Sequence, residues 1–448
     1  MEPSNPFHPD NISLGHVETF LQTLFEQFEP EAEYSPTRGR PRVFPSMCLW
    51  AGMFVCLLRG YHGQTAVWRL ISQRGLWFYP RPAITDQAIY KRLEQEGSAP
   101  LKELFRQVSR LMAERLTFLL ERSAKRPLAS FASCVVALDE TKLDPIAKTL
   151  PKLRELPKGD KGLMPGKLAS LFDIRLQQWI RIDHITNPDQ NDKVHARTMI
   201  EELPPKSLIL ADMGYFGFAW FDDLTAREHY FISRVRKKTT YEIKHIFYQS
   251  QDYLDAIIFL GAFRADKTEH AVRLVEFSLN GVRYTYITNV LDPQVLTIDQ
   301  IAKLYARRWD IEMAFKLIKQ HLKLHMLWSA KTEIILQQVW ACLTIAQVMH
   351  GMQMEIALRA GVDVFDVSLP LLIEYAPKIA YTGQDPIQHF VEQGVEARFI
   401  RPSRRIRIQT PTIEAQNIEP IPEGMTLQRT PRYAERRSTH RKTMNNKN

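Results

Sequence analysis

The sequence is poor in cysteine, and its most apolar run is too short to cross a membrane. The four cysteines, Cys48, Cys56, Cys134 and Cys342, form no Cys-x-x-Cys pair, and no histidine cluster accompanies them. This spacing argues against a structural zinc site and predicts reduced core residues. The most apolar run, residues 47–58, is bounded by arginines, and a spanning helix needs roughly 20 residues. A secretory signal pattern is also missing from the polar N-terminus, so we expect a cytoplasmic protein with no membrane partner.

The chain is basic without being unusual in other respects. Its 448 residues are 45% hydrophobic and 24% charged, which is ordinary for a globular protein of one large domain or several smaller ones. The formal net charge of +9 favours a polyanionic partner such as nucleic acid. Ribosome-associated and membrane-surface proteins share such a charge, so composition alone leaves the partner open.

Helical spacing of apolar residues dominates the first part of the chain and predicts an all-helical N-terminal domain over residues 1–127. Within it, residues 65–72 and the helix beginning near Thr85 resemble a helix-turn-helix, although the gap between them is long, and a purely structural bundle explains them equally well. The candidate DNA contacts are two basic residues of the second helix and three arginines of an upstream loop, where a solvated loop is the alternative: Lys91, Arg92, Arg38, Arg40 and Arg42.

The pattern then changes to short buried runs, which predict an α/β core over residues 128–350 with a mixed sheet. Within it, residues 168–172 and 179–185 are expected to pair as antiparallel strands, and residues 284–288 could return the chain to the main sheet. Alternating residues over about 236–286 predict an inserted β-rich subdomain. A further helical region, 351–400, is a candidate for dimerisation, and the arginine-rich, aperiodic residues 401–448 predict a poorly ordered basic tail. Two of the expected strands, 134–138 and 208–211, end on Asp139 and Asp212. Ligand sites in open α/β sheets gather at strand ends.

The strongest predicted helix, residues 297–323, carries a polar stripe directly beside its apolar stripe. At about 100° per residue, Tyr305, Arg308, Glu312 and Lys319 fall within an arc of roughly 60°. Polar groups at the edge of a core need partners or a cleft. An ordinary surface salt bridge between Arg308 and Glu312 would explain the same pattern.

The spacing Tyr-x2-Arg-x3-Glu-x6-Lys of these residues resembles the signature of a branch of DDE transposases from bacterial insertion sequences. The contexts Ala137-Leu138-Asp139-Glu140-Thr141 and Leu210-Ala211-Asp212-Met213-Gly214-Tyr215 are similar to the first and second acidic motifs of that family. Met213 departs from the arginine that the family often has, and Glu140 is unusual beside the first aspartate. The resemblance covers roughly residues 130–350 and implies a ribonuclease-H-like fold.

The resemblance also implies the chemistry of the site. Asp139, Asp212 and Glu312 would be catalytic and would hold two metal ions per active site, Mg²⁺ with Mn²⁺ as a substitute, with Asp139 bridging both. Arg308 and Lys319 would grip DNA phosphates, and Tyr305 would hydrogen-bond one. Trp309 is expected either to be a core aromatic or to stack on an unpaired base.

The expected function is therefore a cut-and-paste transposase that acts on double-stranded DNA, namely the terminal inverted repeats of its element and a target. It would work as a homodimer on the bacterial nucleoid, because two ends must be joined in one complex. Two alternatives remain open: a ribonuclease-H-like metal-dependent nuclease without strand transfer, and an inactive transposase-derived DNA-binding regulator.

Overall fold

A computed structural model of the chain describes residues 6–28, 44–123, 127–143, 154–155, 166–187, 190, 192–263, 266–279, 281–324, 326–403 and 409–433. The chain falls into two compact units. Unit 1 comprises residues 1–130, 134–203 and 306–407, and unit 2 comprises residues 131–133, 204–305 and 408–448. These boundaries differ from the expected ones at 127 and 350, because the N-terminal helices belong to the same unit as the first strands of the expected core.

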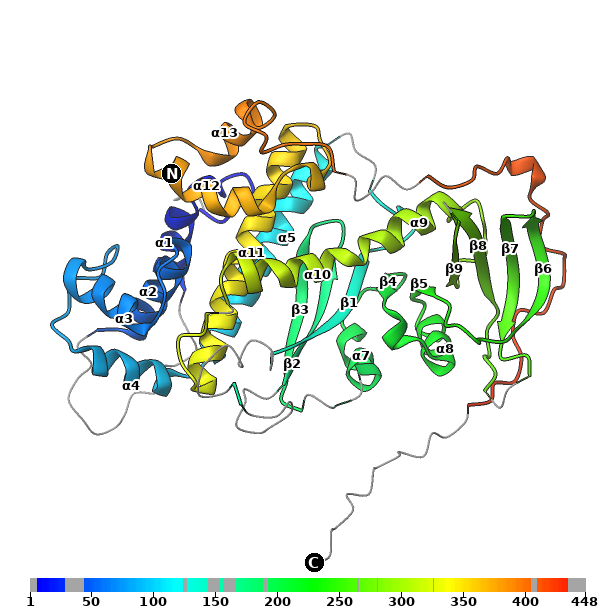
Figure 1. Cartoon of the computed structure of the whole chain (residues 1–448), viewed down its shortest axis with the longest axis horizontal. Coiled ribbons are helices and arrows are strands. Elements are labelled where there is room, and N and C mark those ends of the chain that lie inside the picture. Colours follow the sequence, from blue (N-terminus) through cyan, green and yellow to red (C-terminus); the bar gives the residue numbers. More distant parts are fainter. Residues whose placement is uncertain are drawn as a thin grey trace, which may run out of the picture. The chain divides into compact units, whose positions relative to one another are not determined.

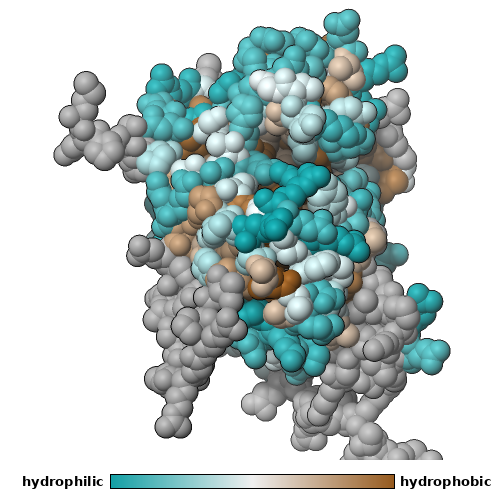
Figure 2. Space-filling view, turned by 90° about the vertical axis from the view of Figure 1, so that its left-hand side faces the viewer, coloured by the Kyte–Doolittle hydropathy of each residue, from teal (hydrophilic) through white to brown (hydrophobic). Residues whose placement is uncertain are grey.

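Helices make up most of unit 1 (Figure 1). Five of its described helices come from the N-terminal part of the chain, and Thr85 caps one of them by accepting a hydrogen bond from the Ala88 backbone N–H. Their bounds are α1 Val17–Gln27, α2 Ser46–Leu58, α3 Gln64–Arg69 with the π-helical turn Leu70–Arg74, α4 Asp86–Glu96 and α5 Ala99–Glu121. The side of the molecule on which α1 to α4 lie is mainly hydrophilic, with hydrophobic residues in small patches (Figure 2).

The core of unit 1 is organised around one long apolar helix, α11 Thr332–Arg359, which runs beside α5 (Figure 1). It is the one helix among the described residues with the length and apolar composition of a membrane span, and its apolar window is fully buried inside the protein. A buried core helix can have the same length and apolar composition as a membrane span, which explains the composition of α11. The helices that follow it are α12 Leu369–Tyr381 and α13 Pro386–Gln393.

An antiparallel sheet in the order β3-β2-β1 completes unit 1. Its strands are β1 Val135–Lys142, β2 Lys167–Asp173 and β3 Gln178–Ile185, and they are followed by α7 Asp192–Ile200. The pairing of the second and third strands was expected. The first strand does not end on Asp139 as predicted, because ladder pairing carries it on to Lys142, with Asp139 opposite Ser170.

Unit 2 contains a mixed sheet in the order β4-β5-β9-β8-β7-β6. The strand β4 Leu208–Ala211 runs parallel to β5 Tyr230–Arg234, with α8 Phe218–Ala226 between them in the chain. The other strands are antiparallel: β6 Tyr241–Gln249, β7 Tyr253–Leu260, β8 Val272–Leu279 and β9 Val282–Thr288. The β-rich segment is therefore continuous with this sheet through the pairing of β9 with β5, as the expected return near residue 284 required.

The C-terminal segment 409–433 packs on unit 2, in contrast to the poorly ordered tail that its aperiodic sequence predicts. Its apolar side chains lie against a buried cluster on the sheet: Ile418, Ile421, Met425 and Leu427 pack on Phe247, Ile257, Phe259 and Ala271. Isolated β-bridges join Lys267 to Arg432 and His270 to Gln428. The segment has no periodicity of its own because it is held by the sheet beneath it, which a sequence pattern does not reveal.

The predicted helix 297–323 is interrupted in the structure. It consists of α9 Ile298–Arg307, α10 Trp309–Lys316 and the π-helical turn η4 Leu317–His321. In that turn the Leu322 N–H donates to the carbonyl of Leu317, five residues earlier, at 3.0 Å. This spacing is that of a π-helix. Lys319 lies inside it, so the uniform 100° rotation assumed for the whole helix does not hold at that residue.

Candidate active site

Asp139 lies on β1 in unit 1, at the point where the strand becomes partly exposed. The strand begins with four buried residues and becomes half-buried from Asp139 onward. Because successive side chains of a strand point to opposite faces, Asp139 and Thr141 share one face and Glu140 lies on the other. The Asp139 carboxylate accepts a hydrogen bond from the Glu140 backbone N–H at 2.8 Å, which helps to fix its rotamer.

One guanidinium brings two of the predicted catalytic carboxylates together. Arg308 contacts Glu312 at 2.9 Å through one terminal nitrogen and Asp139 at 4.0 Å through the other. Its own side chain is 6% exposed, whereas those of Asp139 and Glu312 are 22% and 33% exposed. A largely buried cation thus stands between two partly accessible acids, one from β1 and one from α10. The surface salt bridge considered from the sequence exists, but its second partner on the strand makes it part of a cluster.

Lys319 lies beside the same strand. Its ammonium group donates a hydrogen bond to the Thr141 hydroxyl, two residues beyond Asp139 on the same face. Burial lowers the pKa of Lys319 from its ordinary value, and the Asp139 carboxylate opposes that effect. Asp139, Arg308, Glu312 and Lys319 therefore form one cluster in unit 1, as the resemblance implied.

A second polar network, which sequence reasoning missed, holds α10 in place. Asp310 is buried and accepts hydrogen bonds from Arg307 at 2.7 Å and from the Gln177 side chain at 2.9 Å. Arg307 also donates to the Ile174 carbonyl at 3.1 Å. These bonds tie the start of the helix to the turn between β2 and β3, so they set the position of Glu312 one half-turn later. The i,i+3 spacing of Arg307 and Asp310 was the available signal.

Asp212 belongs to unit 2 and follows β4 directly, as predicted. Its backbone is extended, and its carbonyl accepts a hydrogen bond from the Tyr215 N–H at 2.9 Å, which starts a short 3₁₀ turn at Met213. Arg236 donates to the Met213 carbonyl at 3.0 Å and lies over the Phe216 ring. The loop that carries Asp212 is therefore fixed from within its own unit.

The carboxylates of unit 1 suit a divalent metal ion. Asp139 and Glu312 present hard oxygen donors to the same guanidinium, so a cation is already stabilised between them. No three histidine, cysteine, aspartate or glutamate side chains are grouped as a ligand set in the ranges that the structure describes. Two of the three expected metal ligands, Asp139 and Glu312, thus lie together in unit 1. The third, Asp212, belongs to unit 2.

Glu140, the rival for the first acidic position, is used elsewhere. It forms an ion pair with Lys167 of β2, and both side chains are more than nine-tenths buried. Lys167 also donates to the Gln190 carbonyl at 2.7 Å. A buried pair of this kind is typical of a structural link between strands, and it separates Glu140 from the cluster around Asp139.

The two aromatic residues predicted to contact DNA differ in exposure. Tyr305 is 7% exposed and packs against Tyr286, with ring centroids 5.1 Å apart. Trp309 is 53% exposed, and the Arg308 guanidinium lies 5.3 Å from its ring centroid. The expectation that Trp309 is a core aromatic is therefore wrong, and its ring is accessible for stacking.

The predicted basic contacts of the N-terminal helices have different environments. Lys91 is exposed on α4. Arg92 is held inside the protein, where it pairs with Glu96 at 2.8 Å and donates to the Phe44 carbonyl and the Ser46 hydroxyl at 3.1 and 2.9 Å. Since these bonds use both ends of its guanidinium, we do not assign Arg92 to a DNA surface. Arg38, Arg40 and Arg42 lie outside the described residues.

A basic cavity in unit 2 was not predicted. Its volume is about 680 Å³, and its lining includes Met213 and Gly214 of the loop after Asp212 together with four cationic side chains: Arg234, Arg236, Lys237 and Arg283. One acid, Glu276, also lines it and pairs with Arg283. The run Arg234-Val235-Arg236-Lys237-Lys238 was the available sequence signal.

Comparisons with known proteins show similarity to transposases. Residues 131–348 match the family described as transposase DDE domain. The transposase for insertion sequence element IS1151 of Clostridium perfringens is 24% identical over 307 residues, covering 56% of this chain and 62% of that protein. The putative transposase for insertion sequence element IS4SA of Synechocystis sp. is 22% identical over 196 residues, covering 43% of this chain and 54% of that protein. The chain thus spans less than two thirds of the length of these relatives.

A solved structure, that of the piggyBac transposase synaptic complex with hairpin DNA, aligns with 88% of this chain and 83% of that chain at 8% identity. Its TM-score of 0.43 is too low to indicate a common fold. The family match and the two relatives do not depend on it. Residues 131–348 are similar to the transposase DDE domain, and the chain is similar to transposases of two insertion sequences.

Proposed function

We propose that this chain is a DNA transposase that cleaves at the ends of its element and transfers the strands to a target by cut-and-paste. The observation that carries the proposal is the cluster in which Arg308 holds Asp139 and Glu312 beside Lys319. It lies within the segment that matches the transposase DDE domain. The expected ribonuclease-H-like core, the branch signature and the metal-dependent chemistry are parts of the same proposal.

In this proposal Asp139, Asp212 and Glu312 are the metal ligands. Two bound divalent ions, Mg²⁺ or Mn²⁺, would activate the attacking oxygen and stabilise the leaving oxygen of the phosphodiester. Asp139, which lies beside both Arg308 and Lys319 in the cluster, would serve both ions, as the family resemblance implies. Without metal, the single positive charge of Arg308 reduces the repulsion between the two acids of unit 1.

The cations of the cluster are assigned to DNA phosphates. Arg308 presents a planar fork that suits bidentate phosphate binding, and Lys319 provides a point charge next to β1. The accessible ring of Trp309 is assigned to base stacking and the Tyr305 hydroxyl to a phosphate hydrogen bond. We also assign the basic cavity of unit 2 to DNA phosphates. Four predicted contacts of the N-terminal region are retained: Lys91, Arg38, Arg40 and Arg42.

The proposed partners follow from the reaction. Terminal inverted repeats and a target duplex are its double-stranded DNA substrates, and pairing two ends requires two copies of the chain, for which residues 351–400 offer the helices α12 and α13. The proposed location is the nucleoid in the bacterial cytoplasm. Affinity for DNA should fall steeply with salt, because phosphate contacts release condensed counterions.

The test is incubation of the purified chain and Mg²⁺ with a labelled linear DNA that carries both element ends and a supercoiled target plasmid. Labelled target joined to element ends is the expected product. Cut ends without joined product would favour the alternative of a nuclease without strand transfer. Specific binding with no cleavage in Mg²⁺ or Mn²⁺ would favour the inactive DNA-binding regulator.

A further inference from the structure

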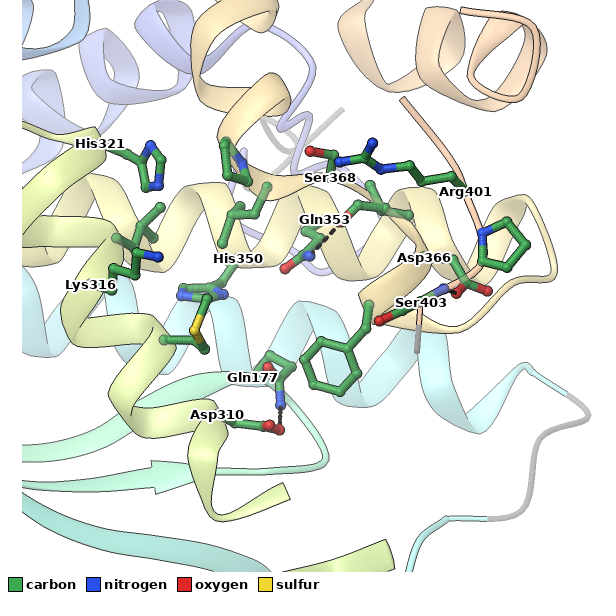
Figure 3. Close-up of a pocket in the computed structure, with 17 residues that line it drawn as sticks. Gln177, Asp310, Lys316, His321, His350, Gln353, Asp366, Ser368, Arg401 and Ser403 are labelled. Carbon is green, nitrogen blue, oxygen red and sulfur yellow. Dashed lines mark hydrogen bonds between the residues drawn. The ribbon is translucent and has the colours of Figure 1, made fainter. Parts of the chain in front are cut away.

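A cavity of about 320 Å³ lies in unit 1 on a different face of α10 from Glu312. Asp310, Met313, Lys316 and Leu317 line it from that helix and from the turn after it. On a helix, these positions are rotated by roughly 40–160° from Glu312, whereas Arg308 lies on the other side of it. The remaining walls come from α11 and from the segments around residues 365–370 and 401–403 (Figure 3). This cavity is therefore separate from the cluster around Asp139.

His350 of α11 is an unusual group in the wall of this cavity. Its side chain faces the cavity in Figure 3 and is 4% exposed, and neither ring nitrogen makes a well-formed hydrogen bond. Burial lowers the pKa of His350 to about 4, an effect that the nearby Gln353 side chain partly opposes, so the ring is neutral at pH 7. A buried imidazole whose ring nitrogens lack well-formed hydrogen bonds carries a desolvation cost. A ligand with an in-plane donor and acceptor would offset that cost.

The walls and the rim supply the other requirements of a ligand. Met313, Leu317, Phe365 and Leu369 provide apolar surface suited to the faces of a planar ring. Lys316 and Arg401 stand at the rim, and within the described part of the chain neither pairs with an acidic side chain. Of the two acids in the lining, Asp310 is neutralised by Arg307. The second, Asp366, accepts a hydrogen bond from the Ser403 N–H at 2.7 Å.

From this combination we propose that the cavity binds a nucleotide. A nucleobase has apolar faces and a polar edge, which match the apolar walls and the two nitrogens of His350. Its phosphate matches the two cations at the rim. The same chemistry is presented by a free mononucleotide and by an unpaired nucleotide of a DNA strand. Binding here involves neither metal nor cleavage, so the inference goes beyond the proposed function and can fail independently of it.

The experiment is isothermal titration of the full-length chain with three probes: deoxyadenosine 5′-monophosphate, inorganic phosphate and a single-stranded tetranucleotide. The mononucleotide should bind at least tenfold more tightly than phosphate. His350→Phe, which keeps the ring volume and removes both nitrogens, should weaken the mononucleotide about tenfold and leave phosphate unchanged. Met313→Trp should weaken it by filling the mouth of the cavity, and Lys316→Ala should weaken mononucleotide and phosphate alike. The control is Lys378→Ala, an exposed lysine of α12 outside the cavity.

The affinity for the tetranucleotide distinguishes a DNA strand from a free nucleotide as the ligand. Tighter binding of the tetranucleotide that is lost in His350→Phe would identify a DNA strand as the source. Equal or weaker binding of it than of the mononucleotide would identify a free nucleotide. Equal affinity for mononucleotide and phosphate would overturn the proposal. So would mononucleotide binding that survives in both His350→Phe and Met313→Trp, provided that thermal unfolding shows both variants to be folded.

Discussion

Replacing Asp222 with alanine should release the C-terminal segment from unit 2. The carboxylate is 5% exposed and accepts hydrogen bonds from the Glu269 and His270 backbone N–H groups, both at 2.9 Å. The Tyr433 hydroxyl, from the C-terminal segment, donates to it at 2.6 Å. One buried acid therefore connects α8, the loop before β8 and the end of the described chain.

The expected magnitude follows from these bonds. A hydrogen bond to a charged group contributes about 1.5–3 kcal/mol, so the two backbone bonds and the Tyr433 bond give about 4–5 kcal/mol at the lower end. The His270 ring nitrogen, 3.2 Å from the carboxylate, adds a longer contact. Removing the charge also removes its desolvation cost, which leaves a net loss of about 3 kcal/mol in the free energy of unfolding for Asp222→Ala. Tyr433→Phe removes one bond and should cost about 1.5 kcal/mol.

The assay is urea unfolding together with limited proteolysis of the C-terminal segment. A matched control is the next residue, Asp223, whose side chain is 25% exposed and pairs with Arg227 one helical turn away. Asp223→Ala should change the stability by less than about 0.5 kcal/mol. The reasoning is refuted if Asp222→Ala unfolds like Asp223→Ala, or if proteases cleave near residues 420–430 equally fast in the wild type and in Asp222→Ala.

Three further predictions follow from individual side chains. Burial raises the pKa of Asp173 to about 6, above its unfolded value, so the group should destabilise the fold as pH rises from about 4 to 6 and remain unfavourable above that range. Asp173→Asn should therefore be more stable than the wild type by about 1–3 kcal/mol at pH 8 and no more stable near pH 4; an identical difference at both pH values in urea unfolding would contradict this. Lys319→Ala should lose cleavage at moderate salt and regain part of it at low salt, whereas Glu312→Ala should not recover, and equal salt profiles would refute the separate roles. Arg92→Ala should cost about 2–3 kcal/mol because it empties a buried ion pair, against less than about 0.5 kcal/mol for Lys91→Ala; the reverse order in thermal unfolding would show that Arg92 is not structural.

The parts of the fold that follow from local pattern were predictable. Short apolar runs located the strands that carry Asp139 and Asp212, and a capping threonine marked the start of α4. The pairing of the second and third strands followed from their spacing. The Tyr-x2-Arg-x3-Glu-x6-Lys spacing identified Arg308, Glu312 and Lys319 as candidate site residues.

Features that depend on distant partners were not predictable. The length of β1 beyond Asp139 is set by its ladder with β2, and the packing of residues 409–433 is set by the sheet of unit 2. The π-helical turn at Lys319 changes the rotation that a regular helix would give. The exposure of Trp309 and the burial of Arg92 likewise depend on neighbours far apart in the sequence. Each of these required tertiary contacts that a periodicity does not encode.

The most direct test of the central claim is cleavage of labelled element ends in Mg²⁺ by the alanine variants of the three proposed metal ligands, with end binding measured in parallel. Asp139→Ala, Asp212→Ala and Glu312→Ala should each abolish cleavage and leave binding nearly unchanged, because phosphate contacts come from lysine and arginine. Asp223→Ala should cleave normally. Full cleavage by any of the three variants would contradict the assignment, and a folded Glu140→Gln variant that binds but cannot cleave would move the first acid from Asp139 to Glu140.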